Sequence, residues 1–125
     1  MDTPSPQRIN DCNVSSLVTL ANESWRFAKV FARAVTKLDA GEQSRYTSQY
    51  RFFIKQLEDT LGNEGFKLVN LEGHIFEPGT AATAINLDDF HADDVLIIDQ
   101  MLEPLIMNDN GIVKTATVIL RKVDK

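Results

Sequence analysis

The chain has 125 residues, a formal net charge of −5 and 43% hydrophobic residues, values typical of a globular protein with one core or two small modules. No run of about 18 apolar residues occurs, and Met1 to Ala21 lacks the pattern of a signal peptide, so we expect a cytoplasmic protein without a membrane span. The single cysteine, Cys12, excludes an internal disulfide.

Charge is distributed unevenly along the chain. Residues 68–113 contain nine Asp and Glu and no Lys or Arg, whereas the rest of the chain has thirteen Lys and Arg against nine acids. An acidic C-terminal half repels phosphate backbones, so nucleic acid is a poor candidate partner for that half. A protein partner with a basic surface fits this pattern better.

The first half of the chain is predicted to be helical. Residues 1–13 lack periodicity and are expected to be flexible, while apolar residues from Val14 to Leu38 recur every three or four positions. Two apolar seams on this helix together cover about 200° of its surface. One seam includes Leu17, Leu20, Phe27 and Phe31, and the other includes Ala21, Trp25, Ala28 and Val35. The remaining face carries Arg26, Lys29, Arg33 and Lys37, which we expect to be a solvated stripe.

A second helix is expected after the segment Leu38-Asp39-Ala40-Gly41, with Asp39 or Ser44 as its cap and Leu61 near its end. Its inward positions are predicted to be Tyr46, Tyr50, Phe53, Leu57 and Leu61. Two helices alone do not bury a double seam, so residues 14–62 are predicted to form a dimeric four-helix bundle. The dimer interface is assigned to Leu17, Leu20, Phe27 and Phe31.

Residues 63–125 are predicted to form a small, mostly antiparallel β domain, which makes the fold class α+β. Strands are expected at 66–71, 80–87 and 94–98, where β-branched and aromatic residues gather between turn residues. Pro104 predicts a sheet edge or a break between short strands within residues 101–107. The Asn110-Gly111 step, flanked by apolar runs from Leu105 to Leu120, predicts a tight hairpin turn.

No catalytic constellation is recognisable. His74 and His91 each lie beside a turn without a Ser or Cys at a useful spacing, and no Gly-rich phosphate loop occurs. The acidic loop Asp88 to Asp94 fails the calcium-loop pattern, because Asp93 stands where the turn-forming Gly is needed. We therefore expect no enzyme, no metal and no cofactor, and a binding module instead.

Several short motifs resemble the GrpE family, the nucleotide exchange factors of DnaK-type chaperones. Leu17 to Asn22 followed by Arg26 is similar to the family's Leu-Leu-Pro-Val-x-Asp/Asn-x-x-x-Arg segment, and Ile54 to Val69 to its stretch of helix, Gly and first strand. Phe76-Glu77-Pro78 stands where the family has Phe-Asp-Pro. Residues 95–100 and 113–120 resemble its final strands. The resemblance covers residues 14–123.

Four features depart from the family pattern. Ala81 stands where the family has His, and Gln100-Met101-Leu102-Glu103 where it has Gln-x-Gly-Tyr. Gly111 replaces a basic residue at the last hairpin turn, and about 13 residues precede the first helix in place of the family's long paired stalk. These differences suggest a short, divergent member whose chaperone partner is a specialised homologue.

The resemblance implies a homodimer whose β domain enters the cleft of a DnaK-type ATPase domain and promotes ADP release. The partner contacts it implies are Asp99, Gln100, Met101, Asn110, Gly111, Lys114, Val118 and Leu120, with core positions as the alternative for Val118 and Leu120. A second function, from another class, is a small acidic dimeric chaperone or adaptor that binds an extended client segment without exchange activity.

Overall fold

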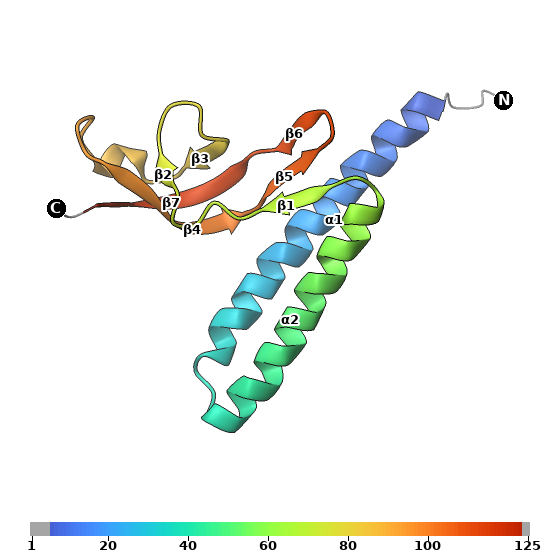
Figure 1. Cartoon of the computed structure of the whole chain (residues 1–125), viewed down its shortest axis with the longest axis horizontal. Coiled ribbons are helices and arrows are strands. Elements are labelled where there is room, and N and C mark those ends of the chain that lie inside the picture. Colours follow the sequence, from blue (N-terminus) through green and yellow to red (C-terminus); the bar gives the residue numbers. More distant parts are fainter. Residues whose placement is uncertain (1–5, 124–125) are drawn as a thin grey trace.

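The structure is a computed structural model that describes residues 6–123, with side chains from residue 14 onward. A β domain projects sideways from one end of a helical hairpin (Figure 1). The elements are α1 (Pro6–Val35), α2 (Ala40–Asn63), β1 (Lys67–Val69), β2 (Ile75–Phe76), β3 (Ala82–Ala84), the 3-10 helix η1 (Leu87–Asp89), β4 (Leu96–Glu103), β5 (Leu105–Asn108), β6 (Gly111–Lys114) and β7 (Ala116–Lys122). This order confirms the predicted α+β class. In this part of the chain neither helix combines the length and the apolar character of a membrane span.

The helix boundaries differ from the predicted ones in two places. Helix α1 begins at Pro6, so residues 6–13, including Cys12, continue the helix that was expected to start at Val14; residues 1–5 lie outside the described part. The break after α1 is made by residues 36–39, and Gly41 belongs to the first turn of α2. Asp39 has extended backbone angles, and its side chain accepts a hydrogen bond of 2.9 Å from the amide of Glu42, which caps α2 as predicted.

Helix α2 ends in a Schellman motif that turns the chain into the β domain. Gly65 has a φ of 81°, and the amide of Phe66 donates to the carbonyl of Leu61 over 2.9 Å. The amide of Gly65 donates to the carbonyl of Gly62. Phe66 and Leu61 then pack together in the core, the apolar contact that accompanies this motif.

The β domain is built on one long, bent hairpin. Strands β4 and β5 run toward the helical hairpin and β6 and β7 run back to the far end of the domain, with breaks at Pro104 and Thr115 that separate two sheets (Figure 1). The three-stranded sheet has the order β1-β5-β6, and the four-stranded sheet β2-β4-β7-β3. All pairs are antiparallel except β3 with β7. The break predicted at Pro104 is confirmed, whereas the predicted strand 80–87 shrinks to β3 and that at 94–98 extends to Glu103.

The predicted hairpin turn lies between β5 and β6. Asn108 pairs with Gly111, which leaves Asp109 and Asn110 as a two-residue loop. The side chain of Asn108 accepts a hydrogen bond of 2.9 Å from the amide of Asn110. Among the four residues 108–111 of this turn, only Gly111 has a positive φ, 121°. The turn therefore uses one left-handed residue instead of the two that an Asn-Gly hairpin of the tightest type requires.

A shared core fixes the β domain to the helical hairpin. Ala21 of α1, Leu61 of α2, Phe66 and Ile106 of β5 form one buried cluster. A larger cluster places Trp25 against the four-stranded sheet. Burial of each large apolar side chain is worth about 1.5 to 3 kcal/mol, so these contacts stabilise the attachment of the β domain to the helices.

Only one of the two predicted seams of α1 is covered. Its members Ala21, Trp25, Ala28 and Val35 are buried against α2 and the β domain. On the other seam Leu20 is 65% exposed and Phe27 71% exposed, and Phe53 of α2, predicted to point inward, is also exposed. We call the surface made by Leu17, Leu20, Phe27 and Phe31 with Phe53 the apolar outer face; Leu17 and Phe31 on it are half-buried and the other three are exposed. Phe31 contacts Tyr46 edge-on with ring centroids 6.1 Å apart.

Candidate functional site

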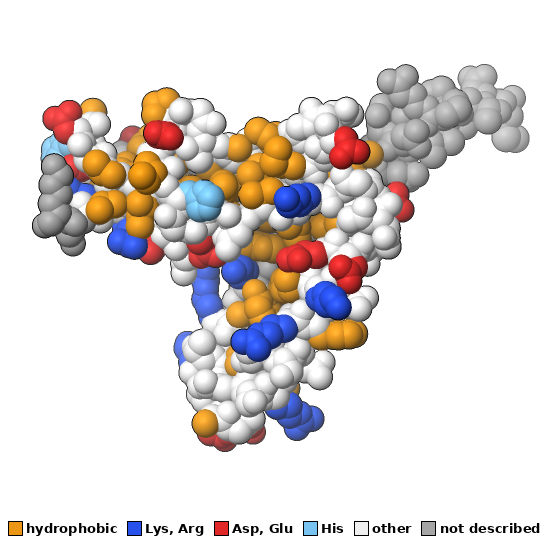
Figure 2. All heavy atoms as spheres, viewed as in Figure 1, with side chains coloured by type: hydrophobic (Ala, Val, Ile, Leu, Met, Phe, Trp, Pro, Cys, Tyr) orange, Lys and Arg blue, Asp and Glu red, His pale blue; other side chains and the backbone are white. Residues whose placement is uncertain are grey.

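A groove of about 590 Å³ lies in the corner where the β domain leaves α1. We call it the corner groove; its walls are formed by Glu23, Arg26, Phe27, Lys29, Val30 and Arg33 of α1 and by Met101, Leu102, Glu103 and Thr117 of β4 and β7. Figure 2 shows Lys and Arg side chains gathered in this corner, beneath the projecting β domain. The groove thus combines cations, two carboxylates and exposed apolar side chains.

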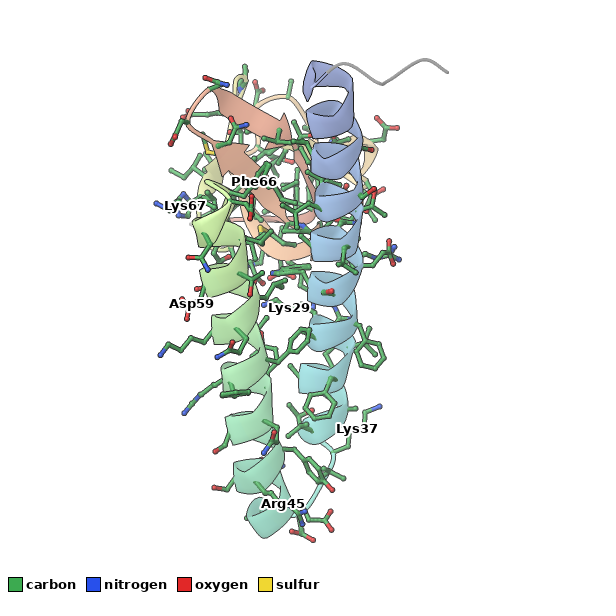
Figure 3. The ribbon with its side chains drawn as sticks, turned by 90° about the vertical axis from the view of Figure 1, so that its right-hand side faces the viewer. Lys29, Lys37, Arg45, Asp59, Phe66 and Lys67 are labelled. Atoms are coloured by element: carbon green, nitrogen blue, oxygen red, sulfur yellow. The ribbon has the colours of Figure 1, made fainter. Side chains whose placement is uncertain are left out.

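The predicted solvated stripe of α1 is confirmed for Arg26, Arg33 and Lys37, which are exposed, but not for Lys29. Lys29 is half-buried, and its ammonium lies 3.4 Å from a carboxylate oxygen of Glu72 and 5.2 Å from the ring centroid of Trp25. The sequence pattern placed Lys29 opposite the apolar seam but did not reveal that β1 and its following turn cover that side. Lys37, by contrast, lies exposed near the tip of the helical hairpin, as does Arg45 on α2 (Figure 3).

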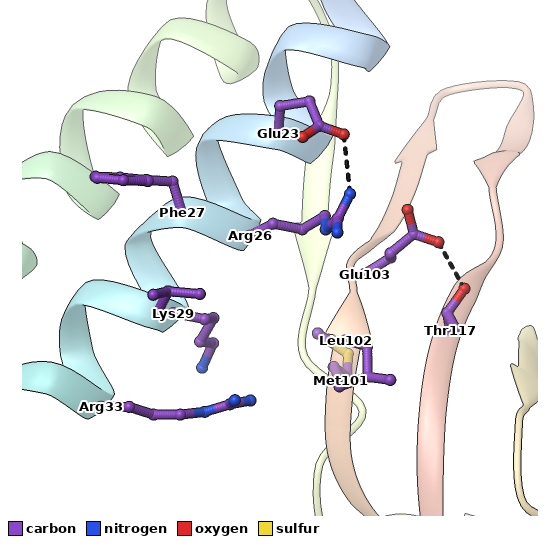
Figure 4. Close-up of a pocket in the computed structure, with 10 residues that line it drawn as sticks. Glu23, Arg26, Phe27, Lys29, Arg33, Met101, Leu102, Glu103 and Thr117 are labelled. Carbon is purple, nitrogen blue, oxygen red and sulfur yellow. Dashed lines mark hydrogen bonds and ion pairs between the residues drawn. The ribbon is translucent and has the colours of Figure 1, made fainter.

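Two arginines of α1 extend toward β4 across the groove (Figure 4). Arg26 is 3.1 Å from a carboxylate oxygen of Glu23, but both side chains are more than half exposed, so this ion pair adds little stability. Arg33 makes no ion pair with any of the described residues. Both guanidinium groups are therefore available for an external carboxylate.

Glu103 joins α1 to the returning strands. Its carboxylate accepts hydrogen bonds from the side-chain amide of Asn22 at 3.0 Å and from the hydroxyl of Thr117 at 2.8 Å. The ammonium of Lys114 lies 3.6 Å from one of its oxygens. The hydrogen bonds from Asn22 and then Thr117 lower the pKa of Glu103, because they stabilise its charged form. Asn22 is buried, and its Oδ1 atom has no hydrogen-bond partner within the described residues. This network ties α1, β4, β6 and β7 together at the corner groove.

Three of the predicted partner contacts are corrected by the structure. Met101, Val118 and Leu120 are buried in the sheet core, with exposed fractions of 4%, 0% and 3%. Because side chains alternate across a strand, these residues face inward. A partner does not reach Val118 or Leu120 in this fold, and Met101 contributes only its small exposed part to the wall of the corner groove. The alternative assignment of Val118 and Leu120 to the core is therefore the correct one.

The other predicted contacts are accessible but do not lie together. Asp99 sits at a bulge of β4 beside the half-buried Gln100 and forms an ion pair of 3.2 Å with Arg121. Asn110 and Gly111 lie at the β5–β6 turn, roughly ten residues after Gln100. A fully extended strand of that length would span about 30 Å, and the break at Pro104 shortens this distance. Lys114, the remaining predicted contact, is half-buried, with its ammonium 3.6 Å from a carboxylate oxygen of Glu103.

The acidic loop is held by local contacts. A carboxylate oxygen of Asp94 accepts a hydrogen bond of 2.9 Å from the amide of His91, and the other lies 3.3 Å from the ammonium of Lys122. The hydrogen bond from His91 lowers the pKa of Asp94. Within the described residues no group of three or more His, Cys, Asp or Glu side chains is arranged to hold a metal ion. The expectation that Asp88 to Asp94 binds no functional metal stays a prediction.

No local sequence pattern indicates the corner groove. In the sequence, Arg26 belongs to the basic stripe of the first helix and Glu103 lies far away in the acidic half, and nothing local links them to each other or to Asn22. Their proximity depends on how β4 crosses α1, which no local pattern specifies. Comparison with models of protein families, with curated proteins and with solved structures found no match for this chain.

Proposed function

We propose that the protein is a GrpE-like nucleotide exchange factor that binds the ATPase domain of a DnaK-type chaperone and promotes ADP release. The observation that carries the proposal is the agreement between motifs and elements. Leu17 to Arg26 falls on α1, Ile54 to Val69 on the end of α2, its glycine turn and β1, and residues 95–100 and 113–120 on the paired ribbon of β4 to β7. Each motif thus occupies the kind of element that the family has at that place.

The proposed role follows from linkage and needs no catalytic group or cofactor. A protein that binds the open, empty form of an ATPase cleft more tightly than the closed form weakens nucleotide binding by the same factor. A β domain that acts as a wedge must not swing freely. The shared core of Ala21, Leu61, Phe66 and Ile106 supports this requirement, because it packs the β domain on both helices.

We also propose that the helical hairpins pair as a homodimer through the apolar outer face. This face contains a shallow apolar depression of about 260 Å³ between Phe27, Phe31, Tyr50 and Phe53 and a second one of about 230 Å³ around Leu17, Leu20 and Leu57. Isolated monomers rarely expose a continuous apolar patch of this kind without a partner. Pairing of two hairpins would complete a four-helix bundle.

The test of exchange activity uses the ATPase domain of a DnaK-type chaperone from the native source, loaded with a fluorescent ADP analogue. The wild-type protein is expected to accelerate analogue release and to bind the nucleotide-free domain more tightly than the ADP-bound domain. A coupling of about 1 to 3 kcal/mol between the two binding events would be typical. Equal affinity with and without ADP would rule out the exchange role, since equal affinity shifts no population.

Lys114 requires a gentler substitution than charge reversal. Lys114→Glu would set a second carboxylate beside Glu103, and the resulting loss of stability would obscure any effect on binding. Lys114→Gln removes the charge alone and is expected to slow analogue release. The matched control is Lys67→Gln, which removes an exposed charge from β1.

One observation favours the adaptor as a second candidate. Strand β6 lies at the open edge of the three-stranded sheet, and Ile112 on it is 53% exposed. An extended client segment could add to this edge by backbone pairing. The two functions separate in one experiment, because an adaptor binds unfolded peptide regardless of nucleotide, whereas an exchange factor binds the folded ATPase domain.

A further inference from the structure

The corner groove presents two arginines at a defined spacing. Arg26 and Arg33 are seven residues apart on α1, which is two helical turns and about 10.5 Å along the axis, so they lie on one side of the helix. Both extend toward β4 (Figure 4), and neither is engaged in a buried ion pair. Arg is the side chain best suited to paired hydrogen bonds with a carboxylate.

Apolar side chains accompany the two arginines. Val30 lies between them in sequence and is 58% exposed, and Leu102 of β4 forms part of the opposite wall. A ligand that fills this groove must therefore offer both acidic and apolar groups. Glu23 and Glu103 line the same groove, so a ligand must place its acids on the arginines and keep them away from these two carboxylates. A helix with widely spaced acids can do so, whereas a nucleic acid backbone carries continuous negative charge.

The groove borders the apolar outer face and shares Phe27 with it, but its two arginines lie on another side of α1. Consecutive residues on a helix differ by about 100°, so Arg26 and Phe27 point to clearly different sides of α1. Arg26 and Arg33 are two turns apart and therefore share one side of α1, and Leu20 and Phe27, also two turns apart, share another side. A second copy bound through Leu20 and Phe27 would thus cover the Phe27 edge of the groove but not the two arginines themselves.

We propose that the corner groove binds an acidic amphipathic helix of a partner protein, with two carboxylates two turns apart on Arg26 and Arg33 and an apolar side chain between them against Val30 and Leu102. In a ligand helix, acids at positions i and i+7 reproduce the arginine spacing. The inference does not depend on nucleotide exchange, because it concerns Arg26 and Arg33, to which the exchange proposal assigns no contact.

The test uses a fluorescein-labelled helical peptide with two glutamates two turns apart and leucine between them, and measures its binding to the full chain by polarisation. Binding is expected to weaken with salt and to fall by about tenfold or more in the Arg26→Gln/Arg33→Gln variant. The matched control, Arg51→Gln/Lys55→Gln, removes two exposed cations of α2 outside the groove and is expected to bind as the wild type.

Two further probes test whether the spacing of the acids matters and whether nucleic acid binds in place of the peptide. A peptide with the same composition but glutamates one turn apart is expected to bind at least several-fold more weakly. A single-stranded oligonucleotide of matched charge is expected not to compete. The proposal is overturned if the two-turn peptide fails to bind, if the one-turn peptide binds equally well, if the groove variant retains full affinity, or if the oligonucleotide displaces the peptide.

Discussion

The two apolar sides of α1 are similar in composition but differ in what the chain supplies to cover them. Trp25 and Ala28 lie against the β domain and α2 and are 6% and 3% exposed. Leu20 and Phe27, on the other side, are mostly exposed. Periodicity therefore indicates that a side of a helix is apolar, but it does not identify the element that covers it.

The two apolar sides of α1 should differ most in what they contribute to the free energy of unfolding. Trp25→Ala removes a large side chain from the main core and is expected to lower the free energy of unfolding by about 3 to 5 kcal/mol. Phe27→Ala, on the apolar outer face, is expected to change it by about 0.5 kcal/mol or less, provided that the protein is dilute enough to be monomeric. Urea denaturation of the two variants measures both values. Equal losses would mean that Phe27 is covered within one chain.

Much of the fold was predictable from local signals. The two helices, the cap at Asp39, the glycine turn after α2 and the break at Pro104 each depend on a few neighbouring residues whose backbone preferences are strong. The early start of α1 was missed because prolines and polar residues near Cys12 weaken the periodic pattern without preventing a helix. Strand lengths were wrong where long-range pairing, as between β4 and β7, extends or shortens a strand.

The corner groove could not be predicted in the same way. Asn22 and Glu103 are 81 residues apart, and they meet only because the Schellman turn at Gly65 directs β1 across the helices and brings β4 back against α1. The partner contacts carried over from the resemblance failed at Val118 and Leu120, because alternation on β7 turns these residues into the core. Register, more than residue type, decides such assignments.

The second prediction concerns the apolar outer face as a dimer interface. Phe27→Asp combined with Phe31→Asp puts two charges where a second hairpin would pack, and it is expected to weaken self-association by about a hundredfold or more. Analytical ultracentrifugation at micromolar concentration should show a dimeric wild type and a monomeric variant. Phe52→Asp, which charges an exposed position of α2 outside both apolar depressions, serves as the control. A monomeric wild type would contradict the proposed interface.

The smallest expected effect lies in the polar part of the covered side, where Glu103 receives hydrogen bonds from Asn22 and Thr117. These bonds lower the pKa of Glu103 in the folded chain, so its carboxylate stabilises the fold above the unfolded pKa of about 4.3. That contribution is lost as the pH falls through the lower folded pKa.

Glu103→Gln is therefore expected to cost about 1 kcal/mol at pH 7. The difference from the wild type should shrink progressively below about pH 4. Urea denaturation across this pH range measures the gap, which is the difference in the free energy of unfolding between the variant and the wild type. Glu64→Gln, at an exposed position after α2, is the control. A gap that stays constant down to pH 2 would show that Glu103 acts through its shape and not through its charge.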